Sequence, residues 1–104
     1  MMREDKRKRI EKKGWHVGSV KEFLGLSPDE AAYIEVKLKL AEGLRRHRRR
    51  RRLTQSEVAR RVKSSQSRVA KMEAGDPSVS LDLIVRSLLA LGASDIELAK
   101  MLRA

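Results

Sequence analysis

Apolar side chains return every three or four positions in five stretches of this chain, which is the spacing of one face of an α-helix. The first stretch is long and runs from Pro28 to about Arg51. Four shorter stretches follow it, at residues 55–62, 66–74, 81–91 and 95–102. The stretch at 81–91 is apolar over most of its circumference, which predicts a central helix. The pattern as a whole predicts an all-α fold of five helices.

Residues typical of helix ends mark the boundaries of these stretches. In a capping box, a Ser or Thr and a Glu three residues later each accept a hydrogen bond from the other's backbone amide. Such boxes begin at Ser27, Thr54 and Ser94. Ser65 and Ser80 are suited to cap the helices that follow them. Gly75 follows the stretch at 66–74, where a helix commonly ends in a left-handed residue.

The first 26 residues differ from the rest of the chain. Residues 1–13 are polar and mixed in charge, so we expect a disordered or fraying arm there. Residues 14–26 (GWHVGSVKEFLGL) form a short apolar element that either packs on its own domain or contacts a partner protein. The sequence therefore predicts an N-terminal basic arm with a short apolar segment at 1–26, and a helical domain at 27–104.

Residues 53–76 (LTQSEVARRVKSSQSRVAKMEAGD) have the pattern of two short helices joined by a tight turn. In the second helix Val69 and Met72 face inward, whereas the opposite face is polar and contains no acid. The residues of this polar face are Gln66, Ser67, Arg68 and Lys71. Such a helix suits insertion into the major groove of DNA, where a glutamine can pair with adenine and a cation with guanine.

The net charge of +11 comes from two segments. Residues 3–13 carry seven cations and three anions, and residues 45–52 (RRHRRRRR) carry seven arginines and no acid. Concentrated positive charge is expected of a protein that binds a polyanion. A basic run can also be only a solvated face or tail, and for residues 3–13 both interpretations stay open. The arginine run directly precedes the two short helices, which favours DNA binding there.

Other features of the sequence exclude several classes of protein. The absence of cysteine excludes disulfides and thiolate metal sites and fits a reducing cytoplasm. We see no signal peptide and no run of about 20 apolar residues, so we expect a cytoplasmic, nucleoid-associated protein without a membrane partner.

Catalytic and metal-binding patterns are also missing. Neither His16 nor His47 has a carboxylate at metal-ligand spacing, and His47 follows Leu44 by one turn, where a packed histidine is expected. The serines lack a triad context, and the glycines form no phosphate loop. The sequence predicts a protein that is not an enzyme and binds no metal or cofactor.

The chain resembles the Xre-type helix-turn-helix proteins, which include the lambdoid phage repressors and Cro. It is most similar to the HigA-like antitoxins of bacterial toxin–antitoxin operons. The resemblance covers about Ser27 to Leu102, and LTQ…SQSRVAKMEAG is its most specific part. The segments GLSPDEAA, LTQSEVA and SQSRVAKMEAGDPSVSLDLI resemble the sequences of the antitoxin branch of this family. The resemblance implies a five-helix, lambda-repressor-like helix-turn-helix domain.

The resemblance also implies roles for individual residues. Gln66, Ser67 and Lys71 fall on base-reading positions, and Arg68 either reads a base or contacts a phosphate. Arg48 matches an arginine that, in similar repressors, pairs with a glutamate near the end of the recognition helix. Here that glutamate is Glu73, so Arg48 and Glu73 are predicted to form a structural ion pair.

Contacts with the DNA backbone are predicted for a second group of residues. A helix start offers free amides to a phosphate, and exposed cations neutralise it. The candidates are Thr54 and Gln55 at a helix start, and the cations Arg45, Arg49, Arg50, Arg52 and Lys63.

Two positions depart from the family pattern. Arg52 replaces the glycine usual between the first two helices, and Lys63 replaces the glycine usual in the helix-turn-helix turn. Each replacement is expected to place a residue with a Cβ at positive φ, at a cost of about 1 kcal/mol. Both replacements also add a cation close to the expected DNA face.

The sequence therefore predicts a repressor that binds a palindromic operator on double-stranded DNA as a homodimer. We expect the dimer interface on the helices at 81–91 and 95–102. The resemblance implies a second task, which is to neutralise a RelE- or HigB-like toxin and to autoregulate their shared operon, with residues 1–26 as the candidate toxin contact. Two alternatives stay open: a stand-alone regulator without a toxin, and a polybasic RNA- or ribosome-associated adaptor.

Overall fold

The computed structural model describes residue 25 and residues 27–104. The chain divides into two compact units, Met1–Glu35 and Val36–Ala104. The predictions for the basic arm, the apolar segment and the toxin contact concern residues that lie almost entirely outside the described part. Within the described part every regular element is an α-helix, which confirms the predicted all-α class.

The long predicted helix is α3, Pro28–Arg50. At its start the predicted capping box is present, because Ser27 Oγ accepts from the amide of Glu30 and Glu30 Oε1 accepts from the amide of Ser27, both at 3.1 Å. Asp29 and Glu30 lie in the first turn and basic residues in the last, an arrangement that complements the helix dipole.

The four shorter helices begin at the predicted residues and end within one residue of the predicted positions. They are α4 (Gln55–Arg61), α5 (Gln66–Ala74), α6 (Leu81–Ala90) and α7 (Asp95–Arg103). Each begins after a Ser or Thr whose hydroxyl accepts a backbone amide, and the boxes of Thr54 and Ser94 are complete. Gly75 ends α5 in the left-handed conformation, as predicted.

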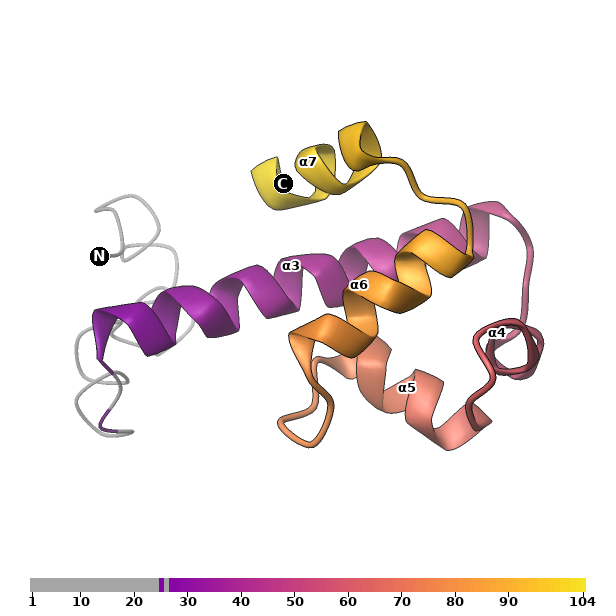
Figure 1. Ribbon diagram of the computed structural model, residues 1–104, viewed down its shortest axis with the longest axis horizontal. Helices are drawn as coiled ribbons and strands as arrows, with labels where there is room; N and C mark the ends of the chain where they lie inside the picture. Colours follow the sequence, from indigo (N-terminus) through magenta and orange to yellow (C-terminus); the bar gives the residue numbers. More distant parts are fainter. Residues whose placement is uncertain (1–24, 26) are drawn as a thin grey trace, which may run out of the picture. The chain divides into compact units, whose positions relative to one another are not determined.

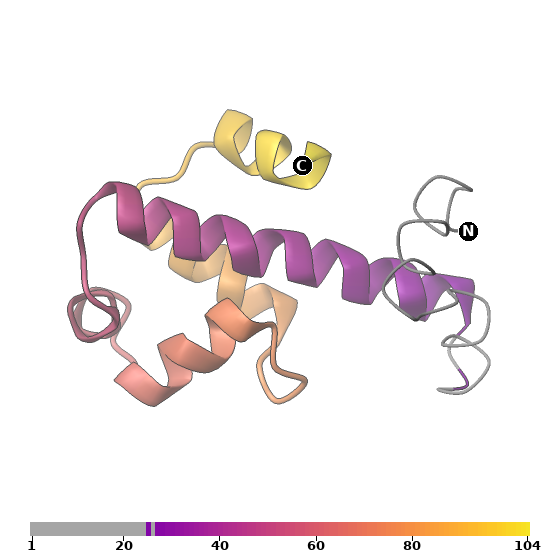
Figure 2. The ribbon, with the colours of Figure 1, turned by 180° about the vertical axis from the view of Figure 1, so that it is seen from behind.

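The core of the Val36–Ala104 unit collects apolar side chains from the second half of α3, α4, α5 and α6. Its largest fully buried side chains are Leu44, Met72, Ile84, Leu88, Leu91, Val58 and Val69. The central place predicted for α6 is seen in its buried Ile84 and Leu88. In Figures 1 and 2, α4 and α5 lie on one side of α3, whereas α7 runs along the opposite side.

Two turns of this unit contain a residue with a Cβ at positive φ, as the sequence predicts. Arg52, between α3 and α4, has φ 56°, and Lys63, between α4 and α5, has φ 57°. Each is a position where glycine would be unstrained. Separately, no helix in the described residues is long and apolar enough to cross a membrane.

Candidate nucleic-acid interface

The polar side of α5 is exposed, and its apolar side is buried. Val69 and Met72 are fully buried in the core. The four residues predicted to read bases, Gln66, Ser67, Arg68 and Lys71, are all exposed. Ser65 caps the helix by accepting from the amide of Arg68 at 3.1 Å, and the first turn of α5 contains no acid. The helix therefore presents donors and neutral acceptors, without a carboxylate that would repel DNA.

A chain of hydrogen bonds links the start of α5 to the start of α4. Gln66 Nε2 donates to Gln55 Oε1 at 2.6 Å, and Gln55 Nε2 donates to Glu73 Oε1 at 3.1 Å. The carboxylate of Glu73 can only accept, so Gln55 must turn its NH₂ toward Glu73 and its oxygen toward Gln66. This order fixes the side chain of Gln66, whose Oε1 and second N–H point to no partner in the described residues.

The chain of hydrogen bonds ends in an ion pair between α3 and α5. Arg48 Nε donates to Glu73 Oε2 at 2.5 Å and Arg48 Nη2 to Glu73 Oε1 at 3.0 Å, a bidentate arrangement. Arg48 Nη1 donates to the carbonyl of Leu53 at 2.9 Å. The side chains are only 13% and 5% exposed. The hydrogen bonds that Arg48 donates to Glu73 raise the pKa of Arg48 above its already high value. Arg48 is thus occupied inside the protein, apart from the other arginines of its run.

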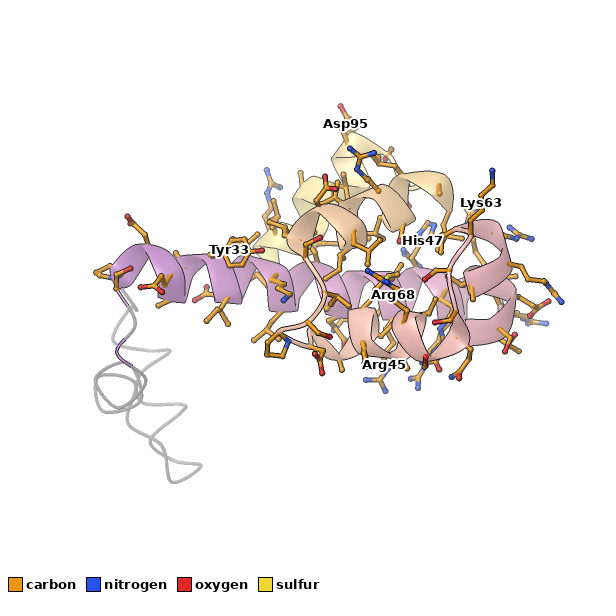
Figure 3. All side chains as sticks on the ribbon, turned by 60° about the horizontal axis from the view of Figure 1, so that its bottom comes forward. Tyr33, Arg45, His47, Lys63, Arg68 and Asp95 are labelled. Carbon is orange, nitrogen blue, oxygen red and sulfur yellow. The ribbon has the colours of Figure 1, made fainter. Side chains whose placement is uncertain are left out.

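The other arginines of α3 point to two different sides. Arg45 precedes Arg48 by about one turn and lies at an edge of the α4–α5 side in Figure 3, and Arg49 follows Arg45 by one turn on the same strip of the helix surface. Arg45 is also 3.7 Å from Glu42. Arg50 lies near α7 instead. The backbone amide of Ser94 does most to lower the pKa of Glu97, and the charge of Arg50 adds to this effect.

Figure 3 looks onto the α4–α5 side. Arg68 stands on this face, with Lys63 toward one edge of the view and Arg45 toward the opposite edge. Arg49 and Arg52 are also exposed. Arg49 lies in the last turn of α3, and Arg52 lies in the turn that joins α3 to α4. Cations therefore border the exposed face of α5, which is the arrangement expected for phosphates on either side of a groove.

A family of helix-turn-helix domains matches residues 39–101 of the chain, from the second half of α3 into α7. The match covers more than half of the chain. This protein belongs to the helix-turn-helix domain family. It is accordingly a DNA-binding regulator, with α4 and α5 as its helix-turn-helix pair. Neither a curated protein nor a solved structure is significantly similar to the chain.

At the start of the helix-turn-helix pair, two predicted phosphate contacts already have partners inside the protein. Thr54 Oγ1 accepts from the amide of Glu57, and the carboxylate of Glu57 accepts from the amide of Thr54. Gln55 uses its side chain between Glu73 and Gln66. The structure thus gives Gln55 a positioning task that the sequence did not reveal.

Two buried polar residues connect α3 to the segments that follow α5 and α6. His47 is 2% exposed and its Nε2 lies 3.0 Å from the carbonyl of Leu91, which confirms the predicted packed histidine. Lys37 is also buried, and its Nζ donates to the carbonyl of Asp76 at 2.9 Å. The sequence analysis did not single out Lys37, although it shares the apolar stripe of Leu40, Ala41 and Leu44. No group of residues that could hold a metal ion occurs within residues 27–104.

Proposed function

We propose that this protein is a sequence-specific repressor that places α5 in the major groove of its operator. The observation that carries the proposal is the chain from Arg48 through Glu73 and Gln55 to Gln66. It anchors an exposed amide to a nearly buried ion pair. A base-reading side chain held in this way loses little conformational entropy on binding, because its orientation is already fixed.

The orientation of Gln66 favours adenine as its target. One N–H of its amide is used by Gln55, while Oε1 and the other N–H remain. These two groups match the N6 donor and the N7 acceptor that adenine presents in the major groove. Arg68 and Lys71 supply donors that suit guanine, and Ser67 supplies a hydroxyl that suits either purine or pyrimidine. Arg68 also has the reach for a phosphate.

Backbone phosphates would be held by the cations that border α5. We assign this task to Arg45, Arg49, Arg52 and Lys63, which are partly or fully exposed on or next to the α4–α5 side. Arg50 lies near Glu97 and would serve only DNA that extends beyond this side. Thr54 and Gln55 would contribute through the backbone at the start of α4, because their side chains have internal partners.

We further propose that the repressor acts as a homodimer on a palindromic operator, with one α5 for each half-site. Exposed apolar side chains on α6 and α7 support an interface there: Leu89 is 52% exposed, Ile96 66% and Leu102 41%. Two copies related by a twofold axis would place their recognition helices about one DNA turn, or a multiple of it, apart.

We also propose a more specific role for this repressor, that of the antitoxin in a toxin–antitoxin operon. It is supported by the sequence of residues 25–84, in which GLSPDEAA, LTQSEVA and SQSRVAKMEAGDPSVSLDLI resemble HigA-like antitoxins. The toxin would be a RelE- or HigB-like ribonuclease encoded next to this protein. A neighbouring gene for a small basic ribonuclease supports this role, whereas its absence favours a stand-alone regulator.

Competition binding tests the repressor function. The full chain should prefer the DNA upstream of its own gene over random duplex by about 10³ or more. Gln66→Ala should lose about 1–3 kcal/mol of preference at one or two operator positions. Arg49→Ala should weaken binding to all sequences alike and lower the salt slope by about one counterion.

Two results would contradict this proposal. Equal affinity for the upstream DNA and random duplex would favour a general polyanion binder, such as an RNA- or ribosome-associated adaptor. Unchanged base preference in Gln66→Ala would show that α5 does not read the operator as proposed.

A further inference from the structure

The two turns that border α4 share an unusual backbone conformation. Arg52 (φ 56°) and Lys63 (φ 57°) are the two non-glycine residues with positive φ in the part of the chain that the structure describes. A residue with a Cβ is disfavoured in this conformation, and glycine is not. Disfavoured backbone conformations in folded proteins concentrate at functional positions. We therefore ask what interaction favours a long cationic side chain, instead of glycine, at both turns.

Contacts with the described residues do not supply that reason. Both residues are exposed. Within residues 27–104 neither side chain takes part in an ion pair or a hydrogen bond. The lowered pKa of the nearby Glu57 is also explained without Arg52 and Lys63. Its hydrogen bonds with Thr54 lower this pKa most, and the charges of Arg60 and Arg61 lower it further.

The helix dipoles do not supply it either. A cation after the last turn of a helix is favourable, and Arg52 follows α3 while Lys63 follows α4. However, the last turn of α3 already holds a histidine and three arginines, and the last turn of α4 holds Arg60 and Arg61. A further cation at each place adds mainly repulsion between like charges.

The location of the two residues points to an external anion. They lie at the two ends of α4, a helix of seven residues and so about 10 Å long. One strand of duplex DNA presents a phosphate about every 3.4 Å along its axis. Two cations at opposite ends of α4 can therefore contact different phosphates of the strand that passes the start of α5. Lys63 lies at an edge of the α4–α5 side in Figure 3.

We propose that Arg52 and Lys63 form a pair of phosphate contacts that flank α4, and that glycine at either position would give a more stable fold but a weaker DNA-binding protein. The inference rests on the proposed DNA-binding function and adds to it a conflict between stability and binding at two named turns. The conflict gives each glycine variant two effects of opposite direction.

Three variants at each position separate charge from backbone conformation. Arg52→Ala and Lys63→Ala remove the charge and keep the Cβ. Arg52→Gly and Lys63→Gly remove both, whereas Arg52→Lys and Lys63→Arg keep both. Lys100→Ala, which removes an exposed cation from α7, is the matched control for the loss of one charge. The full chain is used throughout, with a 30-base-pair duplex of random sequence at several salt concentrations, followed by thermal unfolding without DNA.

The alanine and glycine variants should bind the duplex about threefold to tenfold more weakly than the wild type, with a salt slope lower by about 0.9. Each glycine variant should melt about 4 °C or more above the alanine variant at the same position. The conservative variants and Lys100→Ala should bind as the wild type does.

Three results would overturn the inference, and they are distinguishable. Wild-type affinity and salt slope in the alanine variants would show that these two cations do not contact phosphate, while leaving the proposed reading of the operator by α5 intact. Equal melting temperatures of glycine and alanine variants would remove the conflict between stability and binding. Failure of the wild type to bind the duplex would overturn the proposed function itself.

Discussion

The α4–α5 side and the α7 side of the Val36–Ala104 unit are attached to α3 in different ways. On the α4–α5 side, Val58 and Val69 are fully buried, and the bidentate pair of Arg48 and Glu73 adds directional bonds. No residue of α7 is buried to this degree. Met101 packs where Gly43 leaves room on α3, and Leu102 accepts from Lys39 at 3.1 Å through its backbone carbonyl.

The difference suits the tasks that we propose for the two sides. Reading a base requires a side chain placed to within a fraction of an ångström, and directional polar contacts anchored in a core provide that. A dimer interface requires exposed apolar area, and α7 offers Ile96 and Leu102. An element with few buried contacts also opens at low free energy, so we expect α7 to be the least stable helix of the unit.

The largest effect is expected from breaking the ion pair on the α4–α5 side. Arg48→Ala leaves the carboxylate of Glu73 nearly buried without its cation, and it also removes the donor to Leu53. Removal of one partner from a buried pair costs about 3–5 kcal/mol. Urea denaturation should therefore show a loss of this size in the free energy of unfolding.

Arg46→Ala is the matched control, because it removes an exposed arginine four residues from Glu42 in the same helix. A loss of less than about 0.5 kcal/mol is expected there. Similar losses in the two variants would mean that the two sides do not differ in the way proposed.

A smaller effect is expected from Gly43→Ala on the α7 side. A Cβ at this position would meet Sδ and Cγ of Met101 closer than real atoms allow, so Met101 must move out of its place against α3 and its packing loosens. The cost of such overpacking, about 1–3 kcal/mol, exceeds the gain of about 1 kcal/mol from alanine in a helix interior. Amide hydrogen exchange should become faster in α7 and stay unchanged in α5.

The sign of the substitution should reverse when the obstructing side chain is absent. In a Met101→Ala background, Gly43→Ala meets no sulfur and keeps its helix propensity, so it should stabilise the protein. A destabilising effect in both backgrounds would show that the contact between Gly43 and Met101 does not position α7.

A third effect, of about 1 kcal/mol, is expected from Gln55→Ala. The substitution leaves Glu73 paired with Arg48 but removes the acceptor that orients Gln66. Preference for the base read by Gln66 should fall about fivefold, which is the worth of one ordinary hydrogen bond. In a Gln66→Ala background the same substitution should change base preference no further, whereas additive losses would mean that Gln55 contacts DNA through its own side chain.

The sequence pattern revealed what depends on neighbouring residues. The family resemblance supplied the ion pair of Arg48 and Glu73, but other contacts that depend on packing were missed. The capping boxes of Thr54 and Ser94 lie within four residues, so their pattern predicts the helix starts directly. The bond between Gln55 and Gln66 spans eleven positions, and that between Lys37 and Asp76 spans 39. Neither leaves a local signal. The position of Arg50 near α7 likewise depends on how α7 packs against α3.

The smallest effect concerns two carboxylates in the same capping position on the two sides. The amide of Thr54 holds the pKa of Glu57 below its ordinary value of 4.5, and the amide of Ser94 does the same for Glu97. A carboxylate whose pKa is lower in the folded state contributes stability that is present above about pH 4.5. This stability is lost as the pH falls through the folded value.

Replacement of either residue by glutamine keeps an acceptor for the capping box and removes the titration. Glu57→Gln should therefore flatten the fall of global stability below pH 4.5, because α4 belongs to the side that unfolds with the core. Glu97→Gln should leave the global transition unchanged and flatten the pH dependence of amide exchange in α7 alone, since α7 opens before the rest. If both variants changed the global transition equally, α7 would unfold together with α4 and α5, and the two sides would form one cooperative unit.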